Sequence, residues 1–212
     1  MRIELQSPNH YLRWMNGEQR RIGITGGIAS GKSSIGKFLE QVKKITILDA
    51  DEFSHEAIEA DGDAHAAVLN RYGEKIINPN HPLTIDRRAL AKIIFNNVNE
   101  RIWLEKVIHP IIKIRLEEEL KKNANSPIIA LIVPLLFEAN LNYLCSEIWV
   151  VNCTKLQQEE RLINRDKLTI KEAQNRIKAQ MPLSEKILLG DKVIDNSKGF
   201  ECWRNQVEKL LD

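Results

Sequence analysis

A short segment near the start of the chain, GITGGIASGKSS at residues 23–34, carries the residue types that bind phosphate. The pattern G-x-x-x-x-G-K-[ST] is met by Gly26, Gly31, Lys32 and Ser33. In such a loop the backbone N–H groups surround an anion, the lysine reaches the β- and γ-phosphates, and the serine hydroxyl binds Mg²⁺. A glycine-rich turn that only caps a helix is the alternative, but a chance match in a chain of this length is rare, on the order of one in a hundred. The segment therefore predicts a nucleotide-phosphate site.

Two further pairs of charged residues could act on a phosphate held there. Asp49 and Asp51 follow an apolar run, and ligands of doubly wound sheets bind outside the carboxyl ends of the strands. Asp51 is the candidate base for an acceptor hydroxyl, although the pair also fits a helix N-cap or a surface pair. Arg161 and Arg165 share one helix face and could close over the phosphates, although such a pair alone more often forms a solvated face.

The elements that must position these residues alternate between short apolar runs and helical patterns. Strands are expected at 21–25, 45–51, 127–134, 147–151 and 192–195. A helix is expected directly after the loop, because its apolar residues recur at helical spacing: Ile35, Phe38, Leu39 and Val42. This alternation predicts an α/β fold with a mostly parallel sheet.

Helical patterns fill most of the remaining chain. Residues 52–125 are expected to be mainly helical with a loop at 78–82, and Asp86 is expected to cap a helix. Pro110 should break or kink the helix that contains it. Residues 155–180 predict two short helices separated near 166–169, and the apolar residues of the C-terminal segment predict a closing helix.

Composition excludes several classes of protein. The 212 residues are 43% hydrophobic and 28% charged, and a net charge of +2 gives no reason to expect a nucleic-acid or membrane partner. The longest apolar run, at 128–137, is about half of what a membrane span needs. Three cysteines without a CxxC pair fit a reducing cytoplasm. Residues 1–20 are interpreted as a polar extension without an assigned role.

Three classes of phosphate-loop protein compete. A GTPase would normally carry N-K-x-D and D-x-x-G, and the chain has neither. An ATPase motor would normally show an apolar strand that ends in paired acids, whereas the run at 128–133 ends in Pro134 with only Glu138 beyond it. A small-molecule kinase fits best. The residues alone leave open an acceptor such as a nucleoside monophosphate or a small alcohol, and also a nucleotide sensor without turnover.

Eight segments, taken in order, resemble the dephospho-coenzyme A kinase family. They are GITGGIASGKSS (23–34), DADEFSHE (49–56), IDRRALAKIIF (85–95), LEKVIHPII (104–112), VPLLFE (133–138), QEERLINRD (158–166), RIKAQ (176–180) and VIDN (193–196). The resemblance extends from about residue 21 to the C-terminus. HP or VPLLFE alone would be a weak signal, but eight segments in family order are a strong one.

The resemblance implies a fold, a reaction and a set of partners. The fold is a three-layer α/β/α P-loop kinase fold with a central, mostly parallel sheet of five strands. Its core would comprise 21–51, 127–154 and 186–212, with a helical acceptor-binding insertion at 52–126 and a lid at 155–185. The reaction is phosphorylation of the ribose 3′-hydroxyl of dephospho-coenzyme A by ATP with Mg²⁺. A cytoplasmic monomer or weak homo-oligomer with no nucleic-acid or membrane partner is expected.

The resemblance also assigns roles to individual residues. The catalytic residues would be Asp51, Lys32 and Arg161. ATP would be held by Gly27, Ile28, Ala29, Ser30, Gly31, Lys32, Ser33, Ser34, Arg165 and Asn196, with Ser33 on the metal. The acceptor would be held by Asp51, His109, Pro134, Leu135, Leu136, Phe137 and Glu138.

Two residues depart from the family pattern. Ala29 stands where the family usually has glycine; phosphate binding by its N–H survives if φ there is negative. Gly190 stands where alanine is common.

Overall fold

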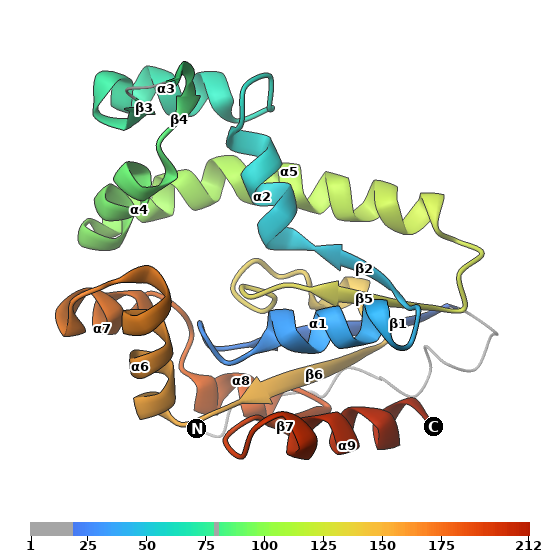
Figure 1. Cartoon of the computed structure of the whole chain (residues 1–212). Coiled ribbons are helices and arrows are strands. Elements are labelled where there is room, and N and C mark those ends of the chain that lie inside the picture. Colours follow the sequence, from blue (N-terminus) through green and yellow to red (C-terminus); the bar gives the residue numbers. More distant parts are fainter. Residues whose placement is uncertain (1–18, 79–80) are drawn as a thin grey trace, which may run out of the picture.

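The computed structural model describes residues 19–78 and 81–212, and Figure 1 shows how its elements are arranged. The central sheet contains β1 (Arg20–Gly26), β2 (Thr46–Asp49), β5 (Ile128–Ile132), β6 (Glu147–Asn152) and β7 (Lys192–Asp195). A small hairpin contains β3 (Ile77–Asn78) and β4 (His81–Ile85). The α-helices are α1 (Lys32–Gln41), α2 (Ala50–Ile58), α3 (His65–Tyr72), α4 (Arg87–Asn96), α5 (Val98–Lys122), α6 (Lys155–Asp166), α7 (Ile170–Lys178), α8 (Leu183–Leu189) and α9 (Phe200–Leu211). Two short 3₁₀-helices are η2 (Gly73–Ile76) and η3 (Asn142–Leu144).

The central sheet has the strand order β2-β5-β1-β6-β7, and every neighbouring pair is parallel. The predicted α/β fold with a parallel sheet of five strands is therefore confirmed. The pairing brings Ile24 of β1 and Asp49 of β2 opposite the same residue, Ile132 of β5. The carboxyl ends of β1 and β2 consequently lie at one edge of the sheet, where the phosphate loop and the two acids follow them.

Both faces of the sheet are buried, because successive side chains along each strand point to opposite sides. Ile22 and Ile24 of β1 pack with Trp203 of α9 on one face. Ile129 and Leu131 of β5 belong to the cluster on the other face, which α5 covers. Two helical layers around one sheet give the three-layer architecture that the family resemblance implies.

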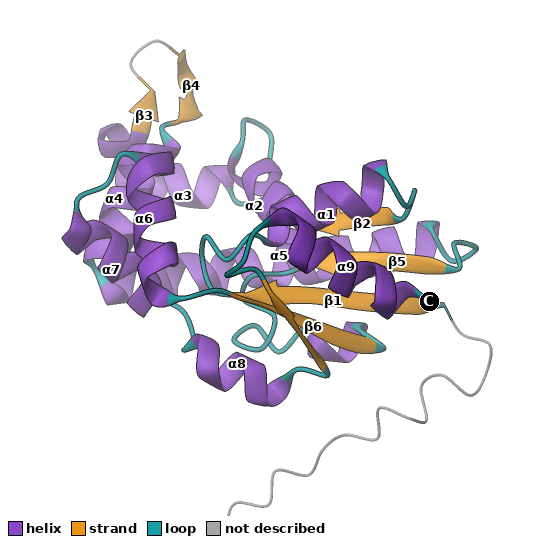
Figure 2. Cartoon of the chain, turned by 60° about the horizontal axis from the view of Figure 1, so that its bottom comes forward, coloured by secondary structure: helices purple, strands orange, loops and turns teal. Residues whose placement is uncertain are grey.

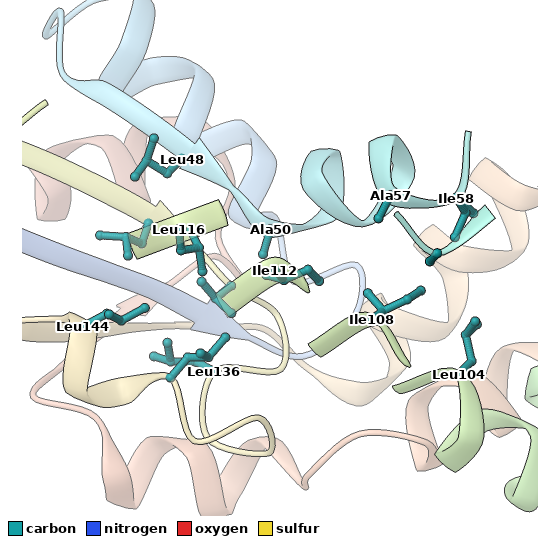
Figure 3. Close-up of a cluster of buried hydrophobic side chains, with 14 of the residues drawn as sticks. Leu48, Ala50, Ala57, Ile58, Leu104, Ile108, Ile112, Leu116, Leu136 and Leu144 are labelled. Carbon is teal, nitrogen blue, oxygen red and sulfur yellow. The ribbon is translucent and has the colours of Figure 1, made fainter. Parts of the chain in front are cut away.

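The long helix α5 connects the sheet to the helices of the insertion. Its buried residues recur every four positions: Leu104, Ile108, Ile112, Leu116 and Leu120. Figure 3 shows four of them packed with residues of β2, α2 and the segment after β5. This stripe anchors α2 and α4 to the sheet, and α5 contacts both of these helices.

The expected break at Pro110 is wrong, because α5 continues through this residue as one helix, and the kink named as the other outcome stays a prediction. Pro110 and Lys106, whose carbonyl loses its usual partner, are both exposed. Water can therefore bind that carbonyl, while buried residues on both sides of Pro110 keep α5 packed against the core as one helix.

Several local predictions are confirmed and two elements were not foreseen. Helices α6 and α7 are separated at residues 167–169, and Asp86 caps α4 by accepting hydrogen bonds from the amides of Arg88 and Ala89. The hairpin β3–β4 and the short helix α8 lie where no element was expected. Most of the expected N-terminal extension lies outside the described residues, but Arg20 already belongs to β1. No helix in the described ranges could cross a membrane.

Candidate active site

The phosphate loop connects β1 to α1 and requires glycine at three positions. Gly26 has a φ of 148°, and a Cβ there would collide with the carbonyl oxygen of Val151. Gly31 has a φ of 104°, in the region that favours glycine. A Cβ there would also collide with the side-chain amide of Asn196, and a Cβ at Gly27 would collide with that of Gln158. The glycines therefore let neighbouring elements pack directly against the loop backbone.

Backbone amides of the loop supply the groups that can hold an anion. The amides of Ser30 and Ser34 bond carbonyl oxygens within the loop. Within the described residues, no hydrogen bond is made by the amides of Ala29, Gly31, Lys32 and Ser33. These donors converge with the N-terminus of α1, whose first amides are unsatisfied by the helix itself. The arrangement suits a phosphate group.

Phosphate binding by the N–H of Ala29 was expected to survive if φ at this residue is negative. Its φ is 58°, so this condition is not met. The residue adopts the left-handed conformation that glycine accepts freely and that costs an L-residue about 1–2 kcal/mol. The loop therefore keeps the backbone shape of a glycine at this position and stores a small amount of strain.

Lys32 begins α1 and is buried beneath the loop, with 7% of its surface exposed. Its Nζ donates to the carbonyl oxygens of Gly26 and Gly27, at 3.2 and 3.0 Å. Burial lowers the pKa of Lys32 to about 8, and the negative charge of Asp51 acts in the opposite direction. The lysine thus lies within electrostatic reach of the candidate base.

The two acids after β2 have different environments. Asp49 caps α2, because its Oδ1 accepts a hydrogen bond from the amide of Asp51 at 2.9 Å. Burial raises the pKa of Asp49 to about 6. Asp51 is exposed and lines the main cavity. A helix N-cap was the alternative role for this pair of acids. Asp49 fills that role, and Asp51 is left to face the cavity.

Three residues, two of α6 and one just after α7, hold the loop. Gln158 of α6 donates to the carbonyl oxygen of Ile28 at 2.8 Å, and Gln180 accepts from the amide of Ile28 at 2.8 Å. Arg161 donates to the carbonyl oxygen of Ala29 at 3.2 Å. Sequence reasoning singled out the arginine but not the two glutamines, although both lie inside segments that carry the family resemblance.

Arg161 and Arg165 have different partners despite sharing α6. Arg161 also donates to the carbonyl oxygen of Asn196 at 3.1 Å. Arg165 forms a two-point ion pair with Asp166, at 2.7 and 3.1 Å, and this pair raises the pKa of Arg165. Arg161 thus braces the loop, while Arg165 lines the cavity beside Asp51.

Asn196 lies under the loop and does not line the cavity. It is 7% exposed, and its Nδ2 donates to the carbonyl oxygen of Ser30 at 2.7 Å. Asn196 therefore contacts the loop backbone and would act on a bound nucleotide through that loop.

One cavity of about 940 Å³ joins the loop, the acids, α5 and α6. This volume is typical of a small-molecule site. The predicted site residues that line it are Ile28, Ala29, Gly31, Lys32, Ser33, Ser34, Asp51, His109, Pro134, Leu135, Arg161 and Arg165. Those that do not line it are Gly27, Ser30, Leu136, Phe137, Glu138 and Asn196. Most of the predicted residues therefore meet at one place.

A buried ion pair supports the acceptor side and was not foreseen from the sequence. Lys186 of α8 is fully buried, and its Nζ lies 2.9 Å from Oε1 of Glu138 and donates to the carbonyl oxygen of Pro134. The amide of Met181 also donates to Oε1 of Glu138, at 2.9 Å. Burial lowers the pKa of Lys186, whereas Glu138 opposes that shift. The pair fixes the segment after β5 against the C-terminal side of the lid.

His109 of α5 is half-buried and lines the same cavity. Burial lowers its pKa, and the charge of Glu138 partly offsets that effect. The neutral imidazole can therefore both donate and accept a hydrogen bond at neutral pH.

A phosphate loop after the central strand of a parallel sheet, an exposed acid at the adjacent strand end and helices over a shared cavity define a P-loop kinase. The family model described as dephospho-CoA kinase matches residues 20–201. The chain belongs to the dephospho-CoA kinase family.

Relatives and solved structures agree with this assignment. A dephospho-CoA kinase of Prochlorococcus marinus is 51% identical over 99% of this chain and 100% of its own length. A crystal structure of a Thermus thermophilus protein is 29% identical, with a TM-score of 0.72 over 92% of this chain and 97% of its own. A dephospho-CoA kinase from Campylobacter jejuni, at 24% identity, shows the same fold with a TM-score of 0.63 over 90% of this chain and 94% of its own.

Proposed function

We propose that the protein transfers the γ-phosphoryl group of ATP to the ribose 3′-hydroxyl of dephospho-coenzyme A, which gives coenzyme A and ADP. The observation that carries this proposal is the single cavity in which the phosphate loop, Asp51 and the walls of the insertion meet. Membership of the dephospho-CoA kinase family names the acceptor.

In the transfer, a bond forms between the 3′-oxygen and the γ-phosphorus, and the bond from that phosphorus to the bridging oxygen of ADP breaks. The carboxylate of Asp51 orients the 3′-hydroxyl and accepts its proton. Lys32 exchanges the carbonyl oxygens of Gly26 and Gly27 for phosphate oxygens, which raises the pKa of its ammonium and stabilises the charge on the transferring group. Arg161 keeps the loop in place, and Arg165 can approach the phosphates from the lid.

The other predicted residues divide between the two substrates. The loop at residues 27–34 holds the nucleotide phosphates, mainly through the free amides of Ala29, Gly31, Lys32 and Ser33, and Asn196 supports it through the carbonyl oxygen of Ser30. His109, Pro134 and Leu135 face the acceptor, whereas Leu136, Phe137 and Glu138 act by shaping the segment that carries them.

The residues present fit Mg²⁺. Ser33 and Asp51 line the same cavity, and the described residues hold no cluster of three or more histidine, cysteine or acidic residues for a metal. That donor set suits a cation held largely by phosphate oxygens. When bound, Mg²⁺ neutralises charge on the β- and γ-phosphates.

The domain organisation and setting follow from the same proposal. Residues 21–51, 127–154 and 186–212 form the core, 52–126 the acceptor-binding insertion and 155–185 the lid, whose closure excludes water. The enzyme acts on small molecules in the cytoplasm, as a monomer or weak homo-oligomer. An odd number of cysteines without a CxxC pair supports that location.

The test measures ADP release from MgATP with dephospho-coenzyme A, AMP or shikimate as acceptor, or with none. We expect strong stimulation by dephospho-coenzyme A alone and coenzyme A as the product. Stimulation by another acceptor would keep the kinase mechanism and reject the substrate. Tight ATP binding without stimulation by any acceptor would instead indicate a nucleotide sensor.

A further inference from the structure

A circuit of hydrogen bonds joins the phosphate loop to the segment after β5. It leaves the loop at Ile28, whose amide donates to Oε1 of Gln180 at 2.8 Å. The next residue, Met181, donates its own amide to Oε1 of Glu138 at 2.9 Å. Gln180 and Met181 therefore connect the loop on one side to the carboxylate of Glu138 on the other.

From Glu138 the circuit returns to the loop through Lys186 and Pro134. The ammonium of Lys186 lies 2.9 Å from Oε1 of Glu138 and donates to the carbonyl oxygen of Pro134. The same carbonyl oxygen accepts a hydrogen bond from Oγ1 of Thr25 at 3.2 Å. Thr25 is fully buried in β1 and directly precedes Gly26, the first glycine of the phosphate-binding motif. Both ends of the circuit consequently attach to the phosphate loop.

The ion pair in this circuit is held deep in the molecule. Helix α8, which carries Lys186, contacts β6 and β1, and Figure 2 shows it beside these strands. The side chain of Lys186 is fully buried, and that of Glu138 is 22% exposed. Burial of two charges costs desolvation energy that offsets much of their attraction. Such a pair does supply directional, charge-assisted hydrogen bonds, which fix the positions of the groups that they join.

Lys186 and Glu138 can reach the reaction site only through other residues. Neither lines the main cavity, whereas Pro134 and Gln180 do. The acceptor wall of that cavity comprises Pro134, Leu135 and the residues of α5 that line it. The circuit thus ties this wall to the loop that would hold the γ-phosphate.

We propose that Lys186 and Glu138 are positioning residues for phosphoryl transfer, because they hold the acceptor wall in register with the phosphate loop. The inference rests on the proposed function, since register matters only where a group passes between two bound molecules. Transfer requires the attacking oxygen to lie about 3–3.5 Å from the phosphorus and in line with the bond that breaks. A displacement of about 1 Å can lower the rate about 100-fold. A circuit of short hydrogen bonds limits such displacements.

The proposal separates the chemical step from substrate binding. The free amides of the loop and the residues of α5 remain in place when the circuit is opened, so each substrate keeps most of its contacts. What is lost is the alignment of the acceptor hydroxyl with the γ-phosphate. Opening the circuit should therefore lower kcat and leave the dissociation constants of the two substrates nearly unchanged.

The experiment opens the circuit at two separate places in the full chain. The double variant Lys186→Met/Glu138→Gln removes the charged donor to Pro134 without leaving an unbalanced buried charge. Thr25→Val removes the hydroxyl donor to the same carbonyl oxygen and keeps a β-branched residue in β1. Lys192→Met, at an exposed lysine of β7, is the matched control. Thermal unfolding checks that each variant is folded at the assay temperature.

Steady-state kinetics and calorimetric titration give the readouts. We expect kcat with dephospho-coenzyme A to fall about 10- to 100-fold in the double variant, and about 3- to 10-fold in Thr25→Val, which leaves the bond from Lys186 in place. The dissociation constants of ATP and dephospho-coenzyme A should change less than about threefold. Since both changes open the same circuit, the triple variant should lose less than the product of the two separate losses. The control should match the unsubstituted chain.

The outcomes distinguish this inference from the proposed function. An unchanged kcat in the folded double variant would overturn the positioning role while leaving the reaction intact. Equal losses in kcat and in affinity for both substrates would overturn it as well, because they would indicate a general disordering of the site. An unsubstituted chain that binds dephospho-coenzyme A without turnover would reject the proposed reaction, and the positioning role with it.

Discussion

The phosphate loop and the acceptor wall of the same cavity differ in which atoms face the ligand. The loop presents backbone amides. Gln158 and Asn196 hold it by donating to the carbonyl oxygens of Ile28 and Ser30, and Gln180 accepts from the amide of Ile28. The acceptor wall presents side chains from α5 and from the segment after β5, among them His109 and Pro134. On the loop side, the backbone conformation sets the positions of the binding groups. On the acceptor side, the packing of helices sets them.

This difference determines how each side responds to substitution. A change in the loop alters backbone shape or support, so it should affect the nucleotide. A change at the acceptor wall alters one contact or one buried pair, so it should affect the acceptor or the free energy of unfolding. The following predictions test this division, beginning with the largest effect.

Asp51→Asn should lower kcat by about 10²- to 10⁴-fold, because the amide cannot accept the hydroxyl proton. ATP affinity should change little, because the loop is untouched. Asp49→Asn is the matched control: asparagine also caps helices, so its kcat should stay within a few-fold of the unsubstituted chain. Steady-state kinetics on both variants checks this. Near-normal turnover in Asp51→Asn would reject the base assignment.

Lys186→Met should lower the free energy of unfolding by about 3 kcal/mol, because it leaves the charge of Glu138 without its counterion. The double variant Lys186→Met/Glu138→Gln removes both charges and should recover a large part of that loss. Denaturant unfolding measures both. A double variant as unstable as the single one would show that the ion pair is not the cause.

ATP affinity should fall as pH rises above about 8, approaching tenfold per pH unit, because phosphate binding favours the charged form of Lys32. Folding has the opposite dependence. The pKa of this lysine is lower in the folded chain than in the unfolded chain, so deprotonation between about 8 and 10.5 increases the free energy of unfolding. Lys32→Met should lose both contributions. Titrations with ATP and with denaturant at several pH values test them, and identical pH profiles for both proteins would contradict the assignment.

Ala29→Gly should change the free energy of unfolding least, with a gain of less than about 1 kcal/mol. Glycine removes the strain of the positive φ but loses more backbone entropy on folding. Thermal unfolding measures the difference. Ser33→Gly, at the start of α1, should instead destabilise the chain because glycine disfavours helix. A large loss of stability in Ala29→Gly would show that the backbone at this position is not strained.

The sequence predicted the nucleotide side better than the acceptor side. A loop that binds through its backbone needs glycines at fixed spacing, and that spacing is visible in any sequence. The ion pair of Lys186 and Glu138 joins residues 48 positions apart. Neither a lysine nor a glutamate in a sequence indicates a buried side chain. A break at Pro110 was expected because the sequence does not show that buried residues anchor a 25-residue helix on both sides of it.

Gly190 illustrates the same limit. Its difference from the family pattern carries no meaning in the sequence alone. In the structure, a Cβ at Gly190 would collide with the side chain of Val150 on β6. Glycine at position 190 therefore leaves room for the side chain of Val150, which only the packing shows.

The buried pair of Lys186 and Glu138 also has an evolutionary consequence. A lineage that replaced either residue alone would pass through a chain with an unbalanced buried charge. Such an intermediate would be selected against even if catalysis were intact. These two positions should therefore change together or not at all, and a relative with an apolar residue at one of them is expected to have an uncharged residue at the other.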